Sequence, residues 1–367
     1  MEPSQEKSTG IVQAELIAPG AQNHFSTPRR FPTAGRRRIL LPILLFLATC
    51  FTTYAAGCYS WNAWETPVLG NPVRIEVKPG DSYTDHKGQP QFAKQRATVW
   101  ASWRDGLRYN WETGVLYMGW VMAILLLHEM GHFIMTLRYK IPASLPFFIP
   151  VPFMVTGTMG AVIGMNPNRA NRKEVFDIGI AGPLAGLVLT IPLLLYGLSV
   201  AEPTPEHPQA RGYGDPLLVK LLIPLLHDIE EVKKEYAEKH NDPTALNKPF
   251  TFFINPIYMA AWVGMLVTGL NMLPVSQLDG GHVSYTLFGR YASWLARGFV
   301  LLAILFIVWT ESYNWTLMLI LVLLIGTDHP PTANDRVKLG PWRYALGLLS
   351  LLIPVFCFTP FPLIMGE

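Results

Sequence analysis

The sequence predicts an all-α polytopic membrane protein with six to seven transmembrane helices and one short re-entrant or strand-like segment. Only 15% of the 367 residues are charged and 50% are apolar, whereas an ordinary soluble domain is about 25% charged. The apolar residues gather in runs of the length that crosses a hydrocarbon core. One further apolar stretch, 142–164, is too rich in proline and glycine for a regular helix. So few charges cannot cover a water-facing surface, which excludes a long soluble enzyme.

The charge balance and the cysteine count exclude two further classes of protein. The net charge is only +3, and no basic stripe is interleaved with aromatic residues as nucleic-acid binding requires. The three cysteines, Cys50, Cys58 and Cys357, are too few for a disulfide framework and lack the paired spacing of a zinc ribbon. We therefore expect no nucleic-acid partner and no cysteine chemistry.

Residues 1–110 are predicted to form a tail, a membrane anchor and a loop. Residues 1–35 are polar and rich in Pro, Gly, Ser and Thr, which predicts a disordered cytoplasmic tail. Three arginines then precede an apolar run, so 36–58 is predicted as the first transmembrane anchor. The alternative is a cleaved leader that would leave Cys58 as a lipidated N-terminus. Residues 59–110 are mixed polar and aromatic and are predicted to form an extracytoplasmic loop.

The membrane core is predicted to span 111–335, and 336–367 is predicted to hold the C-terminal transmembrane helix. The loop at 199–250 contains an apolar run, 217–226, that is too short to span and suits an interfacial or re-entrant helix. Two of the later spans are marginal in length, which leaves the total at six to seven. The expected spans after the anchor are 114–136, 176–198, 252–273, 294–308, 315–325 and 344–358.

Basic residues next to the spans predict the orientation, because cytoplasmic loops carry an excess of Lys and Arg. With the N-terminus in the cytoplasm, three short basic segments fall on that side and the two long loops fall outside. The triple-arginine leader fits a bacterial inner membrane, and a plastid membrane is the alternative. The basic residues that decide the orientation are Arg169, Arg172, Lys173, Arg290, Arg297, Arg336, Lys338 and Arg343.

The second predicted span carries the pattern H-E-x-x-H. On a helix, positions i and i+4 share a face, so His128 and His132 can reach one Zn²⁺ while Glu129 lies beside the open position of the metal. Ionisable residues inside a membrane span are costly unless they serve a polar internal site. The alternative, that they are merely satisfied polar residues of the core, is disfavoured by this cost.

A catalytic zinc needs a third protein ligand and an open position for water. The metzincin class would place a histidine where Arg138 stands, so this class is excluded. Glu174 is the first acidic residue downstream, but it follows a basic turn at a membrane boundary. Asp279 is the better candidate, since it ends an apolar span and Gly280 lets the backbone turn its carboxylate toward a neighbouring helix. Helix capping is the alternative role for this aspartate.

H-E-x-x-H in one span and N-x-x-P-x-x-x-L-D-G in a later one resemble the site-2 protease family of intramembrane zinc metalloproteases. The resemblance covers about 110–335. It implies that His128, His132 and Asp279 bind one Zn²⁺ and that Glu129 is the catalytic base. The ending Asp328-His329-Pro330-Pro331 is most similar to the branch of bacteria and plastids that lacks a PDZ domain, and the sequence shows no cue for such a domain.

Further positions are candidates for substrate binding. The stretch 157–161 resembles the G-x-x-G strand that lies near the active site in this family. Asn271 belongs to the second motif, where a bond to substrate backbone and a helix–helix hydrogen bond are equally compatible with the sequence. The candidate substrate-binding residues are Asn271, Pro274, Gly157, Thr158 and Gly160.

The resemblance implies an intramembrane zinc metalloendopeptidase that acts in regulated intramembrane proteolysis. It would hydrolyse peptide bonds in or near transmembrane segments of membrane-anchored proteins, with such a protein and the lipid bilayer as its partners. Two alternatives stay open at this point. One is a zinc-dependent membrane hydrolase of a non-protein substrate, and the other is a non-enzymatic transporter or scaffold with a structural metal site.

Overall fold

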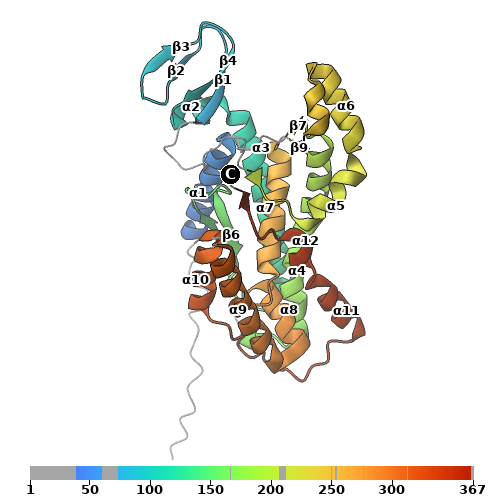
Figure 1. The fold of residues 1–367 in the computed structure, drawn as a ribbon. Coiled ribbons are helices and arrows are strands. Elements are labelled where there is room, and N and C mark those ends of the chain that lie inside the picture. Colours follow the sequence, from blue (N-terminus) through green and yellow to red (C-terminus); the bar gives the residue numbers. More distant parts are fainter. Residues whose placement is uncertain are drawn as a thin grey trace, which may run out of the picture. The chain divides into compact units, whose positions relative to one another are not determined.

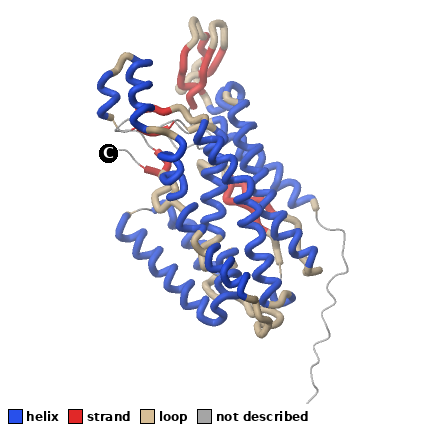
Figure 2. The backbone as a smooth tube through the Cα atoms, turned by 90° about the vertical axis from the view of Figure 1, so that its right-hand side faces the viewer, coloured by secondary structure: helices blue, strands red, loops and turns tan. Residues whose placement is uncertain are grey.

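The computed structural model describes residues 39–59, 73–165, 167–205, 212–248, 250–252, 254–275, 277–311 and 313–364. The predicted tail at 1–35 and the arginines that follow it lie outside the described residues. Within the described part the chain is mostly helical, with short strands in pairs (Figures 1 and 2). The division of the chain at 35, 58, 110 and 335 stays a prediction.

Four helical segments of the described residues are long and apolar enough to cross a membrane. This number supports a polytopic membrane protein but does not confirm six to seven spans. The other three predicted spans form shorter helices: α7 (Pro256–Asn271), α10 (Thr316–Ile325), and the pair α11 (Pro341–Ser350) and α12 (Ile353–Cys357). The four long segments are α1 (Leu40–Cys58), α3 (Trp111–Arg138), α4 (Arg172–Ser199) and Asp279–Thr310, in which α8 (Asp279–Phe288) and α9 (Ala292–Thr310) follow each other.

Local capping explains where the central helices begin. The Asn171 side chain accepts from the backbone of Lys173 and Glu174, and the Glu174 carboxylate accepts from the Asn171 backbone N–H, which is a complete capping box for α4. Asn255 caps α7, and Pro256 occupies its first turn, where a missing N–H costs nothing. The predicted span from 252 is therefore shortened to a helix that starts at Pro256.

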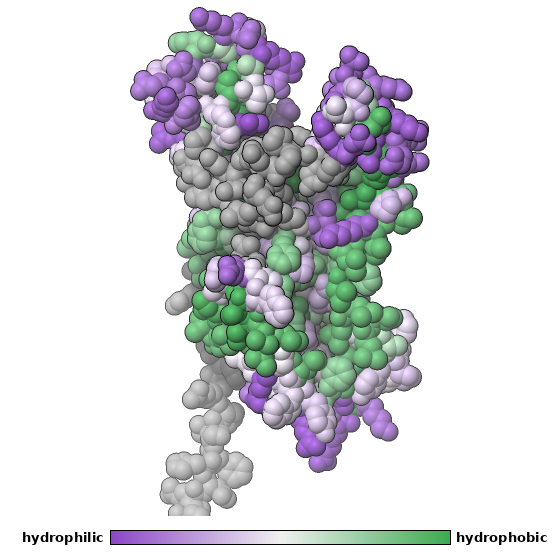
Figure 3. Space-filling view, viewed as in Figure 1, coloured by the Kyte–Doolittle hydropathy of each residue, from purple (hydrophilic) through white to green (hydrophobic). Residues whose placement is uncertain are grey.

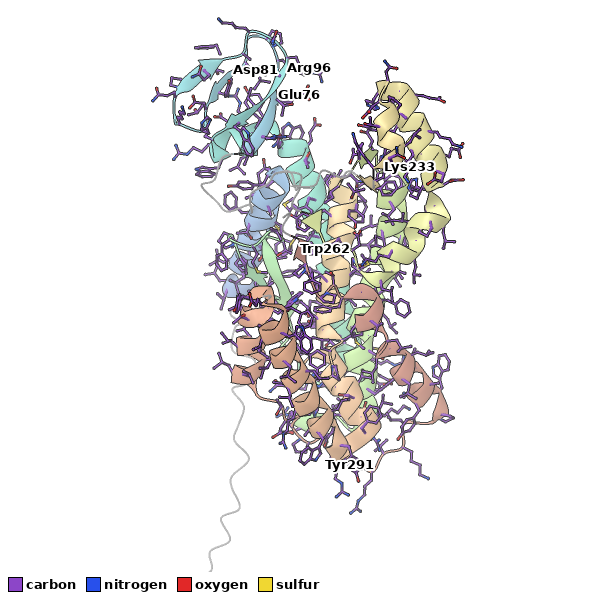
Figure 4. The ribbon with its side chains drawn as sticks, viewed as in Figure 1. Glu76, Asp81, Arg96, Lys233, Trp262 and Tyr291 are labelled. Atoms are coloured by element: carbon purple, nitrogen blue, oxygen red, sulfur yellow. The ribbon has the colours of Figure 1, made fainter. Side chains whose placement is uncertain are left out.

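The core is built around α7, which contacts both α3 and α4. Met259, Trp262 and Met265 of α7 are at most 1% exposed, and Figure 4 shows Trp262 within the helical body. Glycine permits the close packing of α3 on α4, because a β-carbon at Gly131 would lie 2.5 Å from the carbonyl oxygen of Ala181. The helices that carry the sequence motifs are thus neighbours in one core.

The segment broken by proline and glycine forms two strands, β5 (Phe147–Pro150) and β6 (Thr158–Val162), which pair antiparallel with a register shift. Gly157 adopts a φ of +71°, a value that favours glycine, and lies against the backbone of Thr52 and Thr53 in α1. Figure 2 shows these strands among the helices. The strand-like expectation for this stretch is borne out by its backbone pairing.

Two units with hydrophilic surface lie at one end of the apolar helices, at the top of Figure 3. In the first, Glu76 and Arg96 form an ion pair, and both are labelled in Figure 4. In the second, α5 (Leu217–Leu226) is apolar and α6 (Ile229–His240) is charged. The first unit contains β1 (Val73–Val77), β2 (Ser82–Thr84), β3 (Pro90–Phe92), β4 (Ala97–Ala101) and α2 (Trp103–Tyr109), with β1 paired to β4 and β2 to β3. The second is flanked by the strand pairs β7 (Pro203–Pro205) with β9 (Phe250–Phe252) and β8 (Gly212–Tyr213) with β10 (Leu363–Ile364).

Candidate metal centre

The H-E-x-x-H residues lie in the C-terminal half of α3, well inside the helix that ends at Arg138. His128, Glu129 and His132 are 2%, 3% and 9% exposed. The two imidazole rings stand on the helix face that packs against α4, one turn apart, as the i, i+4 spacing requires. The structure thus buries all three ionisable side chains inside the protein.

The orientation of His132 is fixed by a backbone carbonyl of α4. Its Nδ1 lies 2.7 Å from the carbonyl oxygen of Ile178. A carbonyl can only accept, so Nδ1 carries the proton and Nε2 presents its lone pair. Gly182 faces the same ring, and a β-carbon there would overlap it. Ring position and tautomer are both set by α4.

Asp279 is the first residue of α8 and reaches the histidines from across the core. The turn that precedes it is closed by backbone bonds from Val275 to Leu273 and from Leu278 to Val275. Gly280 is required here, because a β-carbon would lie 2.1 Å from the carbonyl oxygen of Met272. The L-D-G sequence therefore lets α8 start directly against the end of α7 and turns the carboxylate inward.

Three ligand atoms converge in this space. His128 Nε2 and His132 Nε2 are 3.2 Å apart, and the Asp279 carboxylate lies 3.1 Å from the first and 3.3 Å from the second. Tetrahedral zinc with ligands at 2.0–2.2 Å separates its donor atoms by about 3.3–3.6 Å. The observed distances lie at or within about 0.2 Å below this range, and the two-nitrogen, one-oxygen donor set suits zinc. Among the described residues this is the group identified as able to hold a metal, and it is consistent with one zinc site.

Glu129 and Asn271 lie beside these ligands. No described residue forms a hydrogen bond or ion pair with the Glu129 carboxylate, although it is buried. The Asn271 side-chain nitrogen lies 3.4 Å from His128 Nε2, at the end of α7. The Glu129 carboxylate is thus not engaged by a neighbouring side chain, and Asn271 brings a polar amide close to His128.

The other substrate-binding candidates lie outside this group. Gly157 packs on α1, and Thr158 is buried with its hydroxyl bonded to Ile149 and Gly160. A β-carbon at Gly160 would be in contact with Val267 of α7. Pro274 lies in the turn before Asp279. The structure therefore brings Asn271 to the three ligands and places β6 beside α7, one turn away along that helix.

Two hydrogen bonds near the site were not predicted from the sequence. The Ile178 carbonyl is a backbone group, so no side-chain pattern marks it, although Gly182 four residues later signals a close approach. His282 and His329 also pair, with His282 Nδ1 2.6 Å from His329 Nε2. His329 is fixed by the Pro330 carbonyl at 2.6 Å from its Nδ1, so His282 donates to it. Only their positions near the motifs hinted at this contact.

Comparison with known families and proteins decides the family. The model of Peptidase family M50 matches residues 117–308, which is more than half of the chain and contains both motifs. The chain belongs to Peptidase family M50, the site-2 protease family. The match ends within α9, so the M50 region does not include α10, α11 or α12.

Several curated proteins are similar to this chain in sequence. A probable chloroplastic zinc metalloprotease of Arabidopsis thaliana, EGY1, is 30% identical over 243 residues, which are 65% of this chain and 42% of that protein. EGY1 of rice, Oryza sativa subsp. japonica, is 31% identical over 65% of this chain and 39% of its own length. EGY2 of Arabidopsis is 28% identical over 71% of this chain and 42% of its own length. The aligned part thus spans about two fifths of these relatives. No solved structure matches the chain.

The contact of Gly182 with His132 yields the first prediction. Gly182→Ala should push the His132 ring out of position and weaken zinc binding at least about tenfold, the usual effect of disturbing groups that orient a ligand. Zinc per chain is measured by mass spectrometry, and affinity by competition with a chelator. The matched control is Gly298→Ala in α9, since no atom lies within 4 Å of a β-carbon there. Unchanged zinc affinity in Gly182→Ala would show that this contact does not position the ligand.

Proposed function

We propose that the chain is an intramembrane zinc metalloendopeptidase. It would hydrolyse peptide bonds in or near transmembrane segments of membrane-anchored proteins, as a step of regulated intramembrane proteolysis. The observation that carries the proposal is the convergence of His128, His132 and Asp279, with Glu129 beside them, on helices long and apolar enough to cross a membrane. The family membership supports the same chemistry.

The roles of the residues follow from their chemistry. His128, His132 and Asp279 would hold Zn²⁺, which supplies positive charge that acidifies water and polarises a carbonyl. Glu129 would accept a proton from water as the water oxygen attacks the scissile carbonyl carbon. It would then pass this proton to the amide nitrogen as the carbon–nitrogen bond breaks. Glu129 ends in its starting state, so the cycle repeats.

The neighbouring residues would serve binding and placement. Asn271 would hydrogen-bond substrate backbone, because its amide lies beside His128 and a peptide at the metal would pass close to it. Pro274 restricts the turn that leads to Asp279 and would keep the carboxylate directed inward. A substrate helix would have to unwind there, since its carbonyls are otherwise engaged in helical bonds.

Two substitutions separate the base from the ligands. Wild type should hold about one zinc and cleave a tagged transmembrane peptide in detergent. Glu129→Gln should keep zinc and lose cleavage by about 100-fold or more, because only the proton acceptor is removed. Asp279→Ala should lose both. Zinc content and peptide products are measured on the same preparations, with Glu112→Gln as the control, an exposed glutamate in the first turn of α3.

The results also separate the alternatives. Cleavage that survives in Glu129→Gln would refute the assigned base. Turnover of a lipid or a small amide without peptide cleavage would favour a hydrolase of a non-protein substrate. Zinc binding without turnover of any of these substrates would favour a structural metal in a transporter or scaffold.

We also propose that the unwound substrate pairs with β6. Within the described residues the sheet contains only β5 and β6, so one edge of β6 has no strand partner. The Thr156 and Thr158 hydroxyls bond the Thr158 carbonyl and the Gly160 backbone, and a paired peptide would replace these bonds. Gly157 would shape the start of this strand, and Thr158 and Gly160 would bind substrate through their backbone. The contact of Gly160 with Val267 brings the strand to α7, the helix that ends at Asn271.

Cross-linking tests this pairing. A photoreactive residue at half-buried Met159 of β6 should cross-link to a transmembrane test peptide held by Glu129→Gln, which cannot release it as product. The control position is Val188 of α4, which is 72% exposed. Cross-linking of equal yield at both positions would contradict a specific strand contact, as would none at Met159 for a peptide that wild type cleaves.

We propose an orientation with the start of α1 in the cytoplasm, in a bacterial inner membrane or, as the alternative, a plastid membrane. Its support is that the basic segments meet at one end of the helices. Arg172 donates to the carbonyls of Thr286 and Leu287 at the end of α8, and Arg297 forms an ion pair with Asp328. Positive charge gathered at one end is typical of the cytoplasmic side.

Labelling of single cysteines tests the orientation. In cells whose outer face is accessible, a membrane-impermeant maleimide should label a cysteine at Lys87, in the turn between β2 and β3. It should reach a cysteine at Lys338 only after permeabilisation. Both lysines are exposed in the structure, so access to the reagent depends on the side of the membrane. The reverse pattern would invert the topology.

A further inference from the structure

Arg343 of α11 joins a cluster that links three helices. Its Nε lies 2.7 Å from Asp177 Oδ1 and its Nη2 lies 2.9 Å from Asp177 Oδ2, so the guanidinium grips the carboxylate with two bonds. The Tyr139 hydroxyl donates to Asp177 Oδ2 at 2.5 Å. Tyr139 follows the last residue of α3, and Asp177 lies in α4. One carboxylate thus receives donors from the ends of two other helices.

This cluster is better shielded than an ordinary surface ion pair. The Asp177 side chain is 11% exposed and the Arg343 side chain 28%. A bidentate arginine–carboxylate pair fixes geometry as well as charge. Its partners are anchored, since each belongs to or directly follows a helix. The cluster can therefore hold the ends of α3, α4 and α11 in one arrangement.

The position of Asp177 connects the cluster with the metal centre. The next residue, Ile178, is the one whose carbonyl accepts from His132 Nδ1. His132 itself lies on α3, two turns before Tyr139. A shift of α3 along α4 would therefore break the Tyr139–Asp177 bond and the His132–Ile178 bond together. Both hydrogen bonds therefore depend on the same register of α3 against α4.

Independent contacts hold α11 against these helices. The Tyr344 hydroxyl lies 3.1 Å from Arg172 Nη2, and Arg172 also caps the last carbonyls of α8. A β-carbon at Gly347 would lie 2.8 Å from the Phe176 ring, which places the α11 backbone directly on α4. α11, which carries Arg343, is thus packed in a defined position against α4, although it lies beyond the region matched by the M50 model.

We propose that Arg343, Asp177 and Tyr139 form a positioning cluster that fixes the register of α3 against α4 and thereby holds His132 in its zinc-binding orientation. The inference rests on the proposed function in one respect, that His132 is a zinc ligand. Arg343 acts through Asp177 and the α4 backbone and touches neither metal nor substrate. Arg343 thereby makes α11 one of the helices that position the zinc ligands.

The test compares zinc affinity in variants of the full chain in detergent. Arg343→Met should weaken zinc binding about tenfold and alter the visible spectrum of the cobalt-substituted protein, because the ligand geometry is disturbed. Arg343→Lys keeps the charge but cannot form both bonds, so it should restore only part of the affinity. Tyr139→Phe removes a single hydroxyl and should have a smaller effect in the same direction. Arg336→Met is the control, since Arg336 is exposed and its side chain bonds no described residue.

The unfolding temperature of the zinc-free protein is measured beside the affinity. A lower unfolding temperature with unchanged zinc affinity and cobalt spectrum would overturn the proposal and leave the cluster a purely structural one. If Arg343→Met does not fold, Tyr139→Phe and Arg343→Lys decide the same question. Failure of wild type to bind zinc would instead refute the metal site itself, so the two failures are distinguishable.

Discussion

The close approach of α3 and α4 is the constraint on which the rest of the site depends. Two imidazoles and a carboxylate largely buried in the protein lose their contact with water, so the protein must supply their partners. Gly131 allows the backbones to meet, and Gly182 and Gly186 leave room for the rings of His132 and His128. At this short separation the Ile178 carbonyl reaches His132. Small residues on one helix thus determine the geometry of ligands on the other.

The electrostatics of the centre follow from the same packing. The Nε2 atoms of His128 and His132 lie 3.2 Å apart, and the Asp279 carboxylate faces both of them. Converging lone pairs and negative charge are unfavourable in a low-dielectric interior unless a cation or proton lies between them. Because His132 Nδ1 is committed to Ile178, its Nε2 remains the atom available to that cation. The arrangement is therefore consistent with one zinc ion held by these three atoms.

The sequence predicted most of what is local and little of what depends on distant contacts. Motif spacing placed His128, Glu129, His132 and Asp279 in two segments, and the structure brings the three expected ligand atoms together. The helix from Pro256 was expected to be longer, because apolar composition does not reveal where Asn255 and Pro256 cap it. The sequence could not predict that the Ile178 carbonyl binds His132, because the carbonyl is a backbone group. It could not predict the ion pair of Arg343 with Asp177 either, because these residues are 166 positions apart.

That long-range pair also bears on how the chain is divided. A boundary at 335 follows the composition, since a polar segment separates the apolar runs there. The hydrogen bonds cross it, because Arg343 binds Asp177 of α4 and Tyr344 binds Arg172 at the start of the same helix. A helix whose polar residues point to another helix, rather than to lipid or water, contributes free energy only when both are assembled. These contacts place α11 against α4, the helix whose Ile178 carbonyl orients His132.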